Sequence, residues 1–384
     1  IFLSLTYLGI GFLLLFNYYS RWNDRYEVTV LFVIGLFFIL YFLNMNKLNQ
    51  LFCFLFISLT ISTVSFLPHW LNWNFTGYEG KSEWGEISSL YDELNNIPAG
   101  RIMWEPNPDL NKYGTPMVLM TIPMFTDHES VEGLYFDSSI TTPYHFVTIS
   151  GLAERPSNPV GGLSYINGNF DKGVRHMKQL GVDYFITYTD SISKKAINSP
   201  ELEFLFESSP FQIFKLKSNK VELVTSELIN FSQPSFYERI SSSVFKKPID
   251  ESFFTLSMKE FQKENNIRVI DKSSIDQIKN KLSTDEAQLN ITEFTLKNNQ
   301  LTFTTNQPGK LHLIKVSYFP NWTIEDGDGP YRITPSFMAI VPNSSDVKLT
   351  FEKTNLEQYL FIFSYLFLTI SILLIIYRMK KHVK

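Results

Sequence analysis

The chain has 384 residues, a formal net charge of −4 and a hydrophobic fraction of 44%. Its basic residues are scattered, so the sequence lacks the continuous basic face of nucleic-acid-binding proteins, and we expect no nucleic-acid partner. The single cysteine, Cys53, excludes an intrachain disulfide. The length suits two or three domains, and the apolar residues are concentrated at the two ends of the chain.

Four apolar segments contain no Asp, Glu, Lys, Arg or His: residues 1–18, 28–43, 51–67 and 358–377. Each is close to the length of about 20 residues that spans the hydrocarbon core of a bilayer. Burial in a soluble core is the alternative for any one of them, but it is a poor explanation for all four. We therefore predict three transmembrane helices within residues 1–68 and a fourth within residues 357–384.

The C-terminal tail sets the expected orientation. Arg378, Lys380, Lys381 and Lys384 follow the last apolar segment, and short basic flanks stay in the cytoplasm. Residues 69–356 then lie outside the cytoplasm, although the two arginines in the outer loop 19–27 conflict mildly with this rule. We predict a multi-pass protein of the plasma (inner) membrane, with the lipid bilayer as its partner. Because Ile1 stands inside an apolar segment, we expect further helices upstream.

Residues 69–220 alternate short strands with helices, which favours an α/β domain. Apolar residues recur at helical spacing over residues 83–96, and a second helix is predicted over residues 173–180. The predicted strands are residues 101–105, 117–122, 133–136 and 184–188.

Residues 221–290 form a mixed connecting region, with a helix expected over residues 272–282. From residue 291 to 356 the apolar residues alternate with period two, which predicts a small antiparallel β-sandwich. Pro308 and Gly309 mark the clearest hairpin, at residues 306–310. The predicted fold class is a partial membrane α-helical bundle with an extracytoplasmic α/β domain and a C-terminal antiparallel β-sandwich. The predicted strands of the sandwich are residues 294–296, 301–303, 311–316, 339–341 and 347–351.

The sequence contains few patterns that indicate a catalytic centre. The histidines outside the membrane segments are widely separated and show no metal-ligand spacing, so we predict no metal site. His128, between Asp127 and Glu129, suits either acid/base chemistry or a solvated loop. No phosphate-binding or dinucleotide fingerprint occurs, which argues against a soluble nucleotide enzyme.

Five residues are candidate substrate contacts. Aromatic rings and carboxylates together suit sugars, because sugar C–H faces stack on rings while hydroxyls bond to carboxylates. The alternative for Trp322 is a buried position at a strand-terminating turn, and for the other candidates it is packing at strand ends. A two-carboxylate hydrolase would additionally need Glu105 and Asp137 at a defined separation. The candidates are Trp104, Glu105, Asp137, His145 and Trp322.

Several short motifs resemble one family. Residues 316–322 (VSYFPNW) and 335–339 (PSFMA), with a final strand that runs into the last helix, resemble the end of the YfhO-like bacterial membrane proteins. The same motifs resemble still more closely those of the related membrane proteins labelled "6-pyruvoyl-tetrahydropterin synthase-related". Residues 83–84 (EW), 100–105 (GRIMWE), 133–139 (GLYFDSS) and 180–184 (LGVDY) are also similar to that group.

The resemblance implies a polytopic protein similar to GT-C glycosyltransferases, which take sugars from polyprenyl-phosphate carriers at the outer face of the membrane. In that superfamily the catalytic acid usually lies in the first outer loop, so we expect the catalytic residues outside this chain and carry none over. The expected function is surface polysaccharide or glycolipid assembly, with a polyprenyl-phosphate-linked sugar as donor and no other cofactor.

Two other functions stay open. The protein is alternatively a non-catalytic membrane protein whose outer domain binds glycan or partner proteins. A transporter component is the second alternative, but it would need charged residues within the membrane, and the four apolar segments have none.

Overall fold

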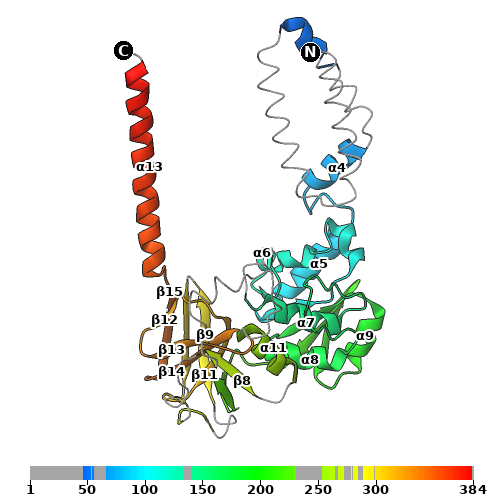
Figure 1. The fold of residues 1–384 in the computed structure, drawn as a ribbon. Coiled ribbons are helices and arrows are strands. Elements are labelled where there is room, and N and C mark those ends of the chain that lie inside the picture. The colour runs from blue at the N-terminus through cyan, green and yellow to red at the C-terminus, as the bar shows by residue number, and fades with distance from the viewer. Residues whose placement is uncertain are drawn as a thin grey trace. The chain divides into compact units, whose positions relative to one another are not determined.

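The computed structural model describes residues 46–52, 54–55, 66–133, 140–225, 227–230, 253–263, 267–271, 278, 280–283, 289–297 and 299–382 (Figure 1). The chain divides into two compact units, Ile1–Gly77 and Tyr78–Lys384. In the first unit the structure describes the helix α4 (Phe66–Phe75). The second unit contains all the strands of the described region and the last helix, α13 (Asn355–His382).

The predicted membrane helical bundle is wrong for the described part of the chain. Those residues form a mixed α/β structure with three β-sheets and one helix that is long and apolar enough to cross a membrane. The prediction placed a helical bundle of apolar segments beside two sheet-containing parts, whereas the described residues are organised by their three β-sheets and contain one helix of membrane-spanning length. The predicted spans 1–18 and 28–43 lie outside the described residues, as does most of 51–67.

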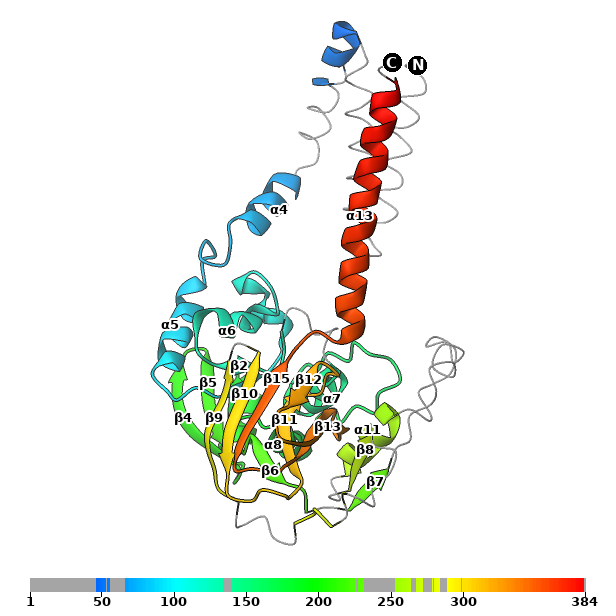
Figure 2. The same cartoon turned by 90° about the vertical axis from the view of Figure 1, so that its left-hand side faces the viewer.

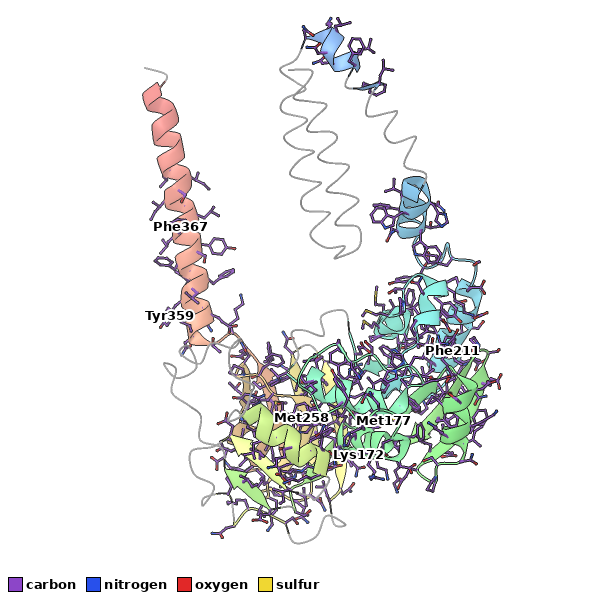
Figure 3. All side chains as sticks on the ribbon, turned by 45° about the vertical axis from the view of Figure 1, so that its right-hand side comes forward. Lys172, Met177, Phe211, Met258, Tyr359 and Phe367 are labelled. Carbon is purple, nitrogen blue, oxygen red and sulfur yellow. The ribbon has the colours of Figure 1, made fainter. Side chains whose placement is uncertain are left out.

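Helix α13 is the helix that meets the length and composition of a membrane span, over Asn355–Leu373. It starts at a capping box, in which the Thr354 amide donates to Glu357 Oε2 (2.7 Å) and the Thr354 hydroxyl accepts from the Glu357 amide (3.3 Å). From Leu356 to Leu373 its large apolar side chains are exposed, as Tyr359 and Phe367 illustrate in Figure 3. Such an all-round apolar surface is compatible with a membrane span.

A five-stranded sheet organises the first half of the second unit, in the order β2-β1-β3-β5-β4. The pairs β1–β2 and β1–β3 are parallel, whereas β5 runs antiparallel to β3 and β4. Its strands are β1 (Arg101–Trp104), β2 (Glu129–Ser130), β3 (Tyr184–Thr187), β4 (Leu202–Ser208) and β5 (Phe211–Leu216). The helices are α5 (Trp84–Asn95), η1 (Pro108–Tyr113), η2 (Val118–Thr121), α6 (Ile122–Phe125), α7 (Thr142–Leu152), α8 (Phe170–Gln179) and α9 (Asp190–Ile197).

The predicted helix 83–96 is confirmed as α5, which buries Ile87, Leu90 and Leu94 against the sheet because these residues share one face. Helix 173–180 and strands 101–105 and 184–188 are also confirmed, as α8, β1 and β3. The predicted strand 117–122 is wrong, because that segment forms η2 and the start of α6. Its continuous apolar run has no period that separates a strand from a buried helical turn. Of the predicted strand 133–136, all but Gly133 lies outside the described residues.

Two further sheets pack in a sandwich-like arrangement around Leu301, Ile314 and Leu349. One has the order β12-β15-β10-β9 and the other β6-β11-β14-β13-β8-β7. The strands are β6 (Val221–Leu223), β7 (Leu228–Asn230), β8 (Arg268–Asp271), β9 (Ile291–Lys297), β10 (Gln300–Thr305), β11 (His312–Ser317), β12 (Trp322–Ile324), β13 (Gly327–Ile333), β14 (Phe337–Pro342) and β15 (Asp346–Phe351), accompanied by α11 (Phe253–Lys263).

The strands predicted within residues 291–356 are confirmed, and the pairs among them are antiparallel. The predicted hairpin at residues 306–310 is wrong, because β10 pairs with β9 and β15 while β11 pairs with β6 and β14. That turn carries the chain from one sheet to the other. The connecting region adds β6, β7 and β8 to the six-stranded sheet, and β7 and β8 are parallel. Most of the predicted helix 272–282 lies outside the described residues.

Helices α7 and α8 fill the space between the five-stranded sheet and the six-stranded sheet. From Tyr144 to Leu152 every residue of α7 is buried, which is the pattern of a helix covered on all sides. One apolar cluster contains Phe185 of β3, Val147 of α7 and Leu313 of β11. The α/β layer and the sandwich therefore share one continuous core. Figure 2 shows the two layers and α13 from the side.

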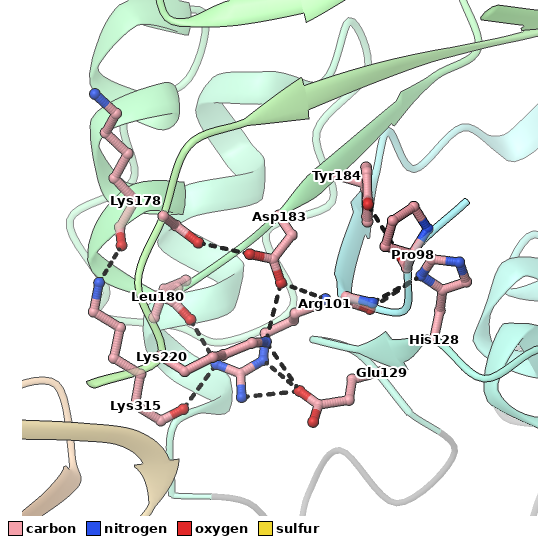
Figure 4. A network of polar contacts seen from close by, with 12 residues as sticks. Pro98, Arg101, His128, Glu129, Lys178, Leu180, Asp183, Tyr184, Lys220 and Lys315 are labelled. Carbon is pink, nitrogen blue, oxygen red and sulfur yellow. Dashed lines mark hydrogen bonds and ion pairs between the residues drawn. The ribbon is translucent and has the colours of Figure 1, made fainter. Parts of the chain in front are cut away.

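A buried polar network joins the two layers beside this core (Figure 4). Arg101 of β1 donates through Nη1 to the carbonyls of Leu180 and Lys315, both at 2.8 Å. Lys315 of β11 donates to the Lys178 carbonyl at 2.8 Å and forms an ion pair with Glu222 of β6. Donors and acceptors of both layers thus satisfy each other, as buried polar groups require.

Gly181 provides a test of this junction. Its φ of +70° favours glycine, and an added Cβ would lie 2.9 Å from Lys315 Cδ and 3.2 Å from Arg101 Nη1. Lys315 is held by its own hydrogen bonds and has little room to move. We expect Gly181→Ala to lower the free energy of unfolding by roughly 2 to 4 kcal/mol, through backbone strain and overpacking. Chemical denaturation followed by tryptophan fluorescence measures this loss in the free energy of unfolding.

Gly309→Ala is the matched control, because Gly309 has a φ of +78° and nothing within 4 Å of the added Cβ. It should cost only about 1 to 2 kcal/mol, the strain of the left-handed backbone alone. Equal losses in the two variants would mean that the packing around Gly181 is not tight.

Candidate functional site

A cleft of about 820 Å³ opens between the α/β layer and the sandwich. Glu129 and Val131 at the edge strand β2 and Thr141 before α7 line one side. The opposite side comes from the four-stranded sheet and from β11. The Thr141 hydroxyl lies 2.9 Å from the Ser317 hydroxyl of β11 and links the two sides. The cleft therefore exists only where the two layers meet.

One wall of the cleft is aromatic. The β12–β15 register places Trp322 opposite Phe351, and their rings meet edge to face with centroids 5.2 Å apart. Phe319 contacts Phe351 in the same manner at 6.3 Å. All three residues line the cleft, and Trp322 is 9% exposed. Such a wall can stack on the apolar faces of a bound sugar.

The base of the cleft is charged. Arg101 lines it and forms an ion pair with Glu129 through Nη2 at 3.1 Å. Burial acts to raise the pKa of Glu129, but the charges of Arg101 and Lys220 outweigh burial and hold that pKa below its ordinary value. Glu129 is thus an anion that holds Arg101 in position. Lys297, exposed at the end of β9, adds a positive charge at the rim.

A buried acid–imidazole pair supports the wall formed by residues 129–133. Glu132 Oε2 lies 3.5 Å from His145 Nε2, and both side chains are largely buried. Burial raises the pKa of Glu132 to about 7 and lowers the pKa of His145 to about 4. Each group therefore favours its neutral form, which suits a hydrogen bond from the carboxyl to the imidazole. The pair connects the loop after β2 to α7, one turn beyond Thr141.

The structure brings together few of the candidate substrate contacts. Trp322 lines the cleft, whereas Trp104 is 3% exposed and packs in the core beneath α5. His145 is buried beside the cleft wall. Asp137 lies outside the described residues.

Glu105 has its carboxylate fully occupied by the protein. It is buried and accepts from the amides of Tyr188 and Thr189, both at 2.9 Å. Its other oxygen accepts from the Thr189 hydroxyl at 2.7 Å and from the Glu154 amide at 3.3 Å. These bonds hold the loop between β3 and α9 against the end of β1. His128, the other acid/base candidate, is also bonded within the protein, with Nε2 2.8 Å from the Leu94 carbonyl.

Sequence reasoning missed the charged residues of the junction. Lys315 stands in the apolar run of β11 and was not singled out, yet its side chain is only 1% exposed. Arg101 opens the buried strand β1 in the same way. A cation within an otherwise apolar strand was the available signal, because such a charge is buried only with a partner.

The described residues contain no group of three or more metal-ligating side chains. The arrangement can bind a ligand that has apolar faces and hydroxyl or anionic groups. No family model, curated protein or solved structure matches this chain. Its chemistry is therefore inferred from the geometry of the cleft.

The pair Glu132–His145 gives a pH prediction. Since burial raises the pKa of Glu132 from 4.5 to about 7, its contribution to stability is complete below pH 4.5 and is lost as the pH rises through 7. The loss amounts to roughly 2 to 3 kcal/mol. The lowered pKa of His145 acts in the opposite direction, because its stabilising contribution is lost as the pH falls from 6.5 towards 4. The test is therefore the unfolding free energy of the wild type minus that of Glu132→Gln, which should fall by this amount between pH 4.5 and pH 7.5. For Glu203→Gln, at an exposed carboxylate on β4, the same difference should not change with pH.

Proposed function

We propose that this protein acts in surface polysaccharide or glycolipid assembly as a membrane protein similar to GT-C glycosyltransferases, and that the cleft beside Trp322 binds the acceptor glycan. The observation that carries this proposal is the combination of an aromatic wall and a charged base in one cleft. Phe351 of that wall is followed after three residues by α13. A glycan in the cleft would therefore lie near the membrane surface if α13 spans the bilayer.

The proposal places α13 in the plasma membrane with the C-terminus in the cytoplasm and residues 69–356 outside. The basic residues that follow the apolar part of α13 support this orientation. We also propose that the protein crosses the membrane several times and uses a polyprenyl-phosphate-linked sugar. The resemblance of the short sequence motifs supports that donor.

The catalytic carboxylate is proposed to lie outside the described residues. Glu105 is saturated by hydrogen bonds and Glu129 is paired with Arg101 and Lys220, so neither is available to attack or protonate a sugar. These contacts equally favour the second candidate function, a non-catalytic membrane protein that binds glycan. The two differ in whether a sugar is transferred.

Gene deletion with mass spectrometry of the surface glycans tests the proposal. We expect a surface glycan to be lost or truncated in the deletion strain and restored by the wild-type gene. A non-catalytic glycan-binding protein would change the amount or location of the glycan but not its sugar composition. Unchanged surface glycans would contradict both functions.

Complementation with variants tests the cleft itself. Trp322→Leu removes the stacking ring and keeps an apolar side chain against Phe351. We expect the glycan affinity to fall roughly fivefold and the restored glycan to fall with it, because a ring contact contributes on the order of 1 kcal/mol. Phe204→Ala is the control, since Phe204 is an exposed aromatic residue on β4 away from the cleft. A wild-type level of glycan with Trp322→Leu would show that the cleft is not the binding site.

A further inference from the structure

An exposed apolar surface lies on the segment between η1 and β2. Met124 is 71% exposed, Met117 45% and Phe125 38%, and Pro116 and Pro123 beside them are also exposed. We call these five residues the α6 surface. Residues 115–126 contain no charged residue, so the surface is apolar without interruption. A monomeric water-soluble protein has little reason to present such a surface.

The protein holds the α6 surface in a fixed conformation. Phe125 stacks on Tyr91 of α5 with ring centroids 5.2 Å apart, and Asn95 of α5 donates to the Phe125 carbonyl at 3.1 Å. The Tyr91 hydroxyl lies 2.6 Å from the Thr121 hydroxyl, and the Thr126 amide donates to the Ile122 carbonyl at 2.9 Å. The exposed methionines therefore lie on an ordered turn, and their exposure does not result from loose packing.

The α6 surface lies at the end of the second unit from which α13 leaves. Three residues lie between Phe125 and Glu129, and three lie between Phe351 and the first residue of α13. Glu129 and Phe351 line the same cleft, so both ends are close to it. Figures 1 and 2, which differ by a 90° turn, both show α6 at this end. A bilayer that contains α13 would therefore face the α6 surface.

We propose that the α6 surface inserts into the lipid interface beside α13, as a second and monotopic membrane contact. The inference rests on the proposed membrane placement of α13. A protruding turn of Pro, Met and Phe suits the boundary between headgroups and acyl chains, because flexible thioethers adapt to mobile neighbours and aromatic rings are favoured there. The absence of charge within residues 115–126 favours lipid tails over a charged protein partner.

This contact would fix the orientation of the cleft. The three residues that join β15 to α13 do not by themselves set the tilt of the domain against the bilayer. An additional contact point at the α6 surface limits that tilt and holds the cleft, which lies between Glu129 and Phe351, next to the bilayer. The cleft would then accept the glycan part of a ligand that is itself anchored in lipid.

Fluorescence quenching in nanodiscs of phosphatidylcholine tests the contact with the full chain. The background variant Cys53→Ser removes the sole cysteine, and single cysteines then carry an environment-sensitive fluorophore. Met124→Cys reports the α6 surface and Leu356→Cys reports the start of α13. Ser345→Cys is the control, because six extended residues of β15 place it about 20 Å from the end of that strand. Lipids with a nitroxide near the top of the acyl chain act as the quencher.

We expect Met124→Cys to be quenched at least roughly twofold more than Ser345→Cys, at a level close to Leu356→Cys. Quenching at Leu356→Cys with none above the control at Met124→Cys would overturn the lipid contact and leave the placement of α13 intact. If Leu356→Cys is not quenched either, both the contact and the proposed membrane placement fail.

Two further measurements exclude other occupants. Protection of Met124→Cys from aqueous iodide without nitroxide quenching would mean that protein covers the surface, which overturns the proposal. In a chain with the reporter at Met117→Cys, the added change Met124→Glu should lower nitroxide quenching roughly twofold, because a carboxylate resists the interface. Ser345→Glu should leave it unchanged. Equal quenching in the two chains would contradict insertion.

Discussion

The fold depends on the burial of cations between two layers that are far apart in the sequence. Arg101 and Lys315 belong to different sheets, and each donates to main-chain carbonyls and to a carboxylate. Burial lowers the pKa of Lys315, and the charge of Glu222 opposes that shift. A buried charge that loses its partner costs about 3 to 5 kcal/mol, so the α/β layer and the sandwich stabilise each other only in the arrangement where all partners meet. The shared apolar core around α7 and α8 supplies the rest of the attraction.

The cleft follows from this junction. Its charged base is the edge of the buried network, and its aromatic wall is the end of the four-stranded sheet where Trp322 and Phe351 pair. Because the chain continues from Phe351 into α13, a few residues connect the cleft to the helix that is long and apolar enough to cross a membrane. The geometry explains why the aromatic residues lie at this end of the sandwich. It also explains why Glu105, buried at the far end of β1, serves the fold instead of a ligand.

The sequence was informative wherever one face of an element is buried. The alternation of apolar residues with period two predicted β9, β10, β11, β14 and β15, and helical spacing predicted α5. Sequence patterns failed where the structure depends on residues that are distant in the chain. The turn at Pro308 and Gly309 is a local signal that does not determine whether the flanking strands pair or pass to different sheets. Trp322 was found because an aromatic residue after a strand is visible in the sequence. Arg101 and Lys315 were missed because their partners, the carbonyls of Leu180 and Lys178 among them, are set by tertiary structure.

Hydrogen–deuterium exchange on the full chain with Arg101→Met tests most directly whether the charged junction couples the two layers. Methionine keeps much of the length of arginine but leaves the Leu180 and Lys315 carbonyls without their donor. We expect amide exchange to rise together in β2 and in β11, on both sides of the cleft, while the β9–β10 hairpin keeps its protection. An increase confined to the neighbourhood of residue 101, with β11 unchanged, would show that the layers hold together without the arginine.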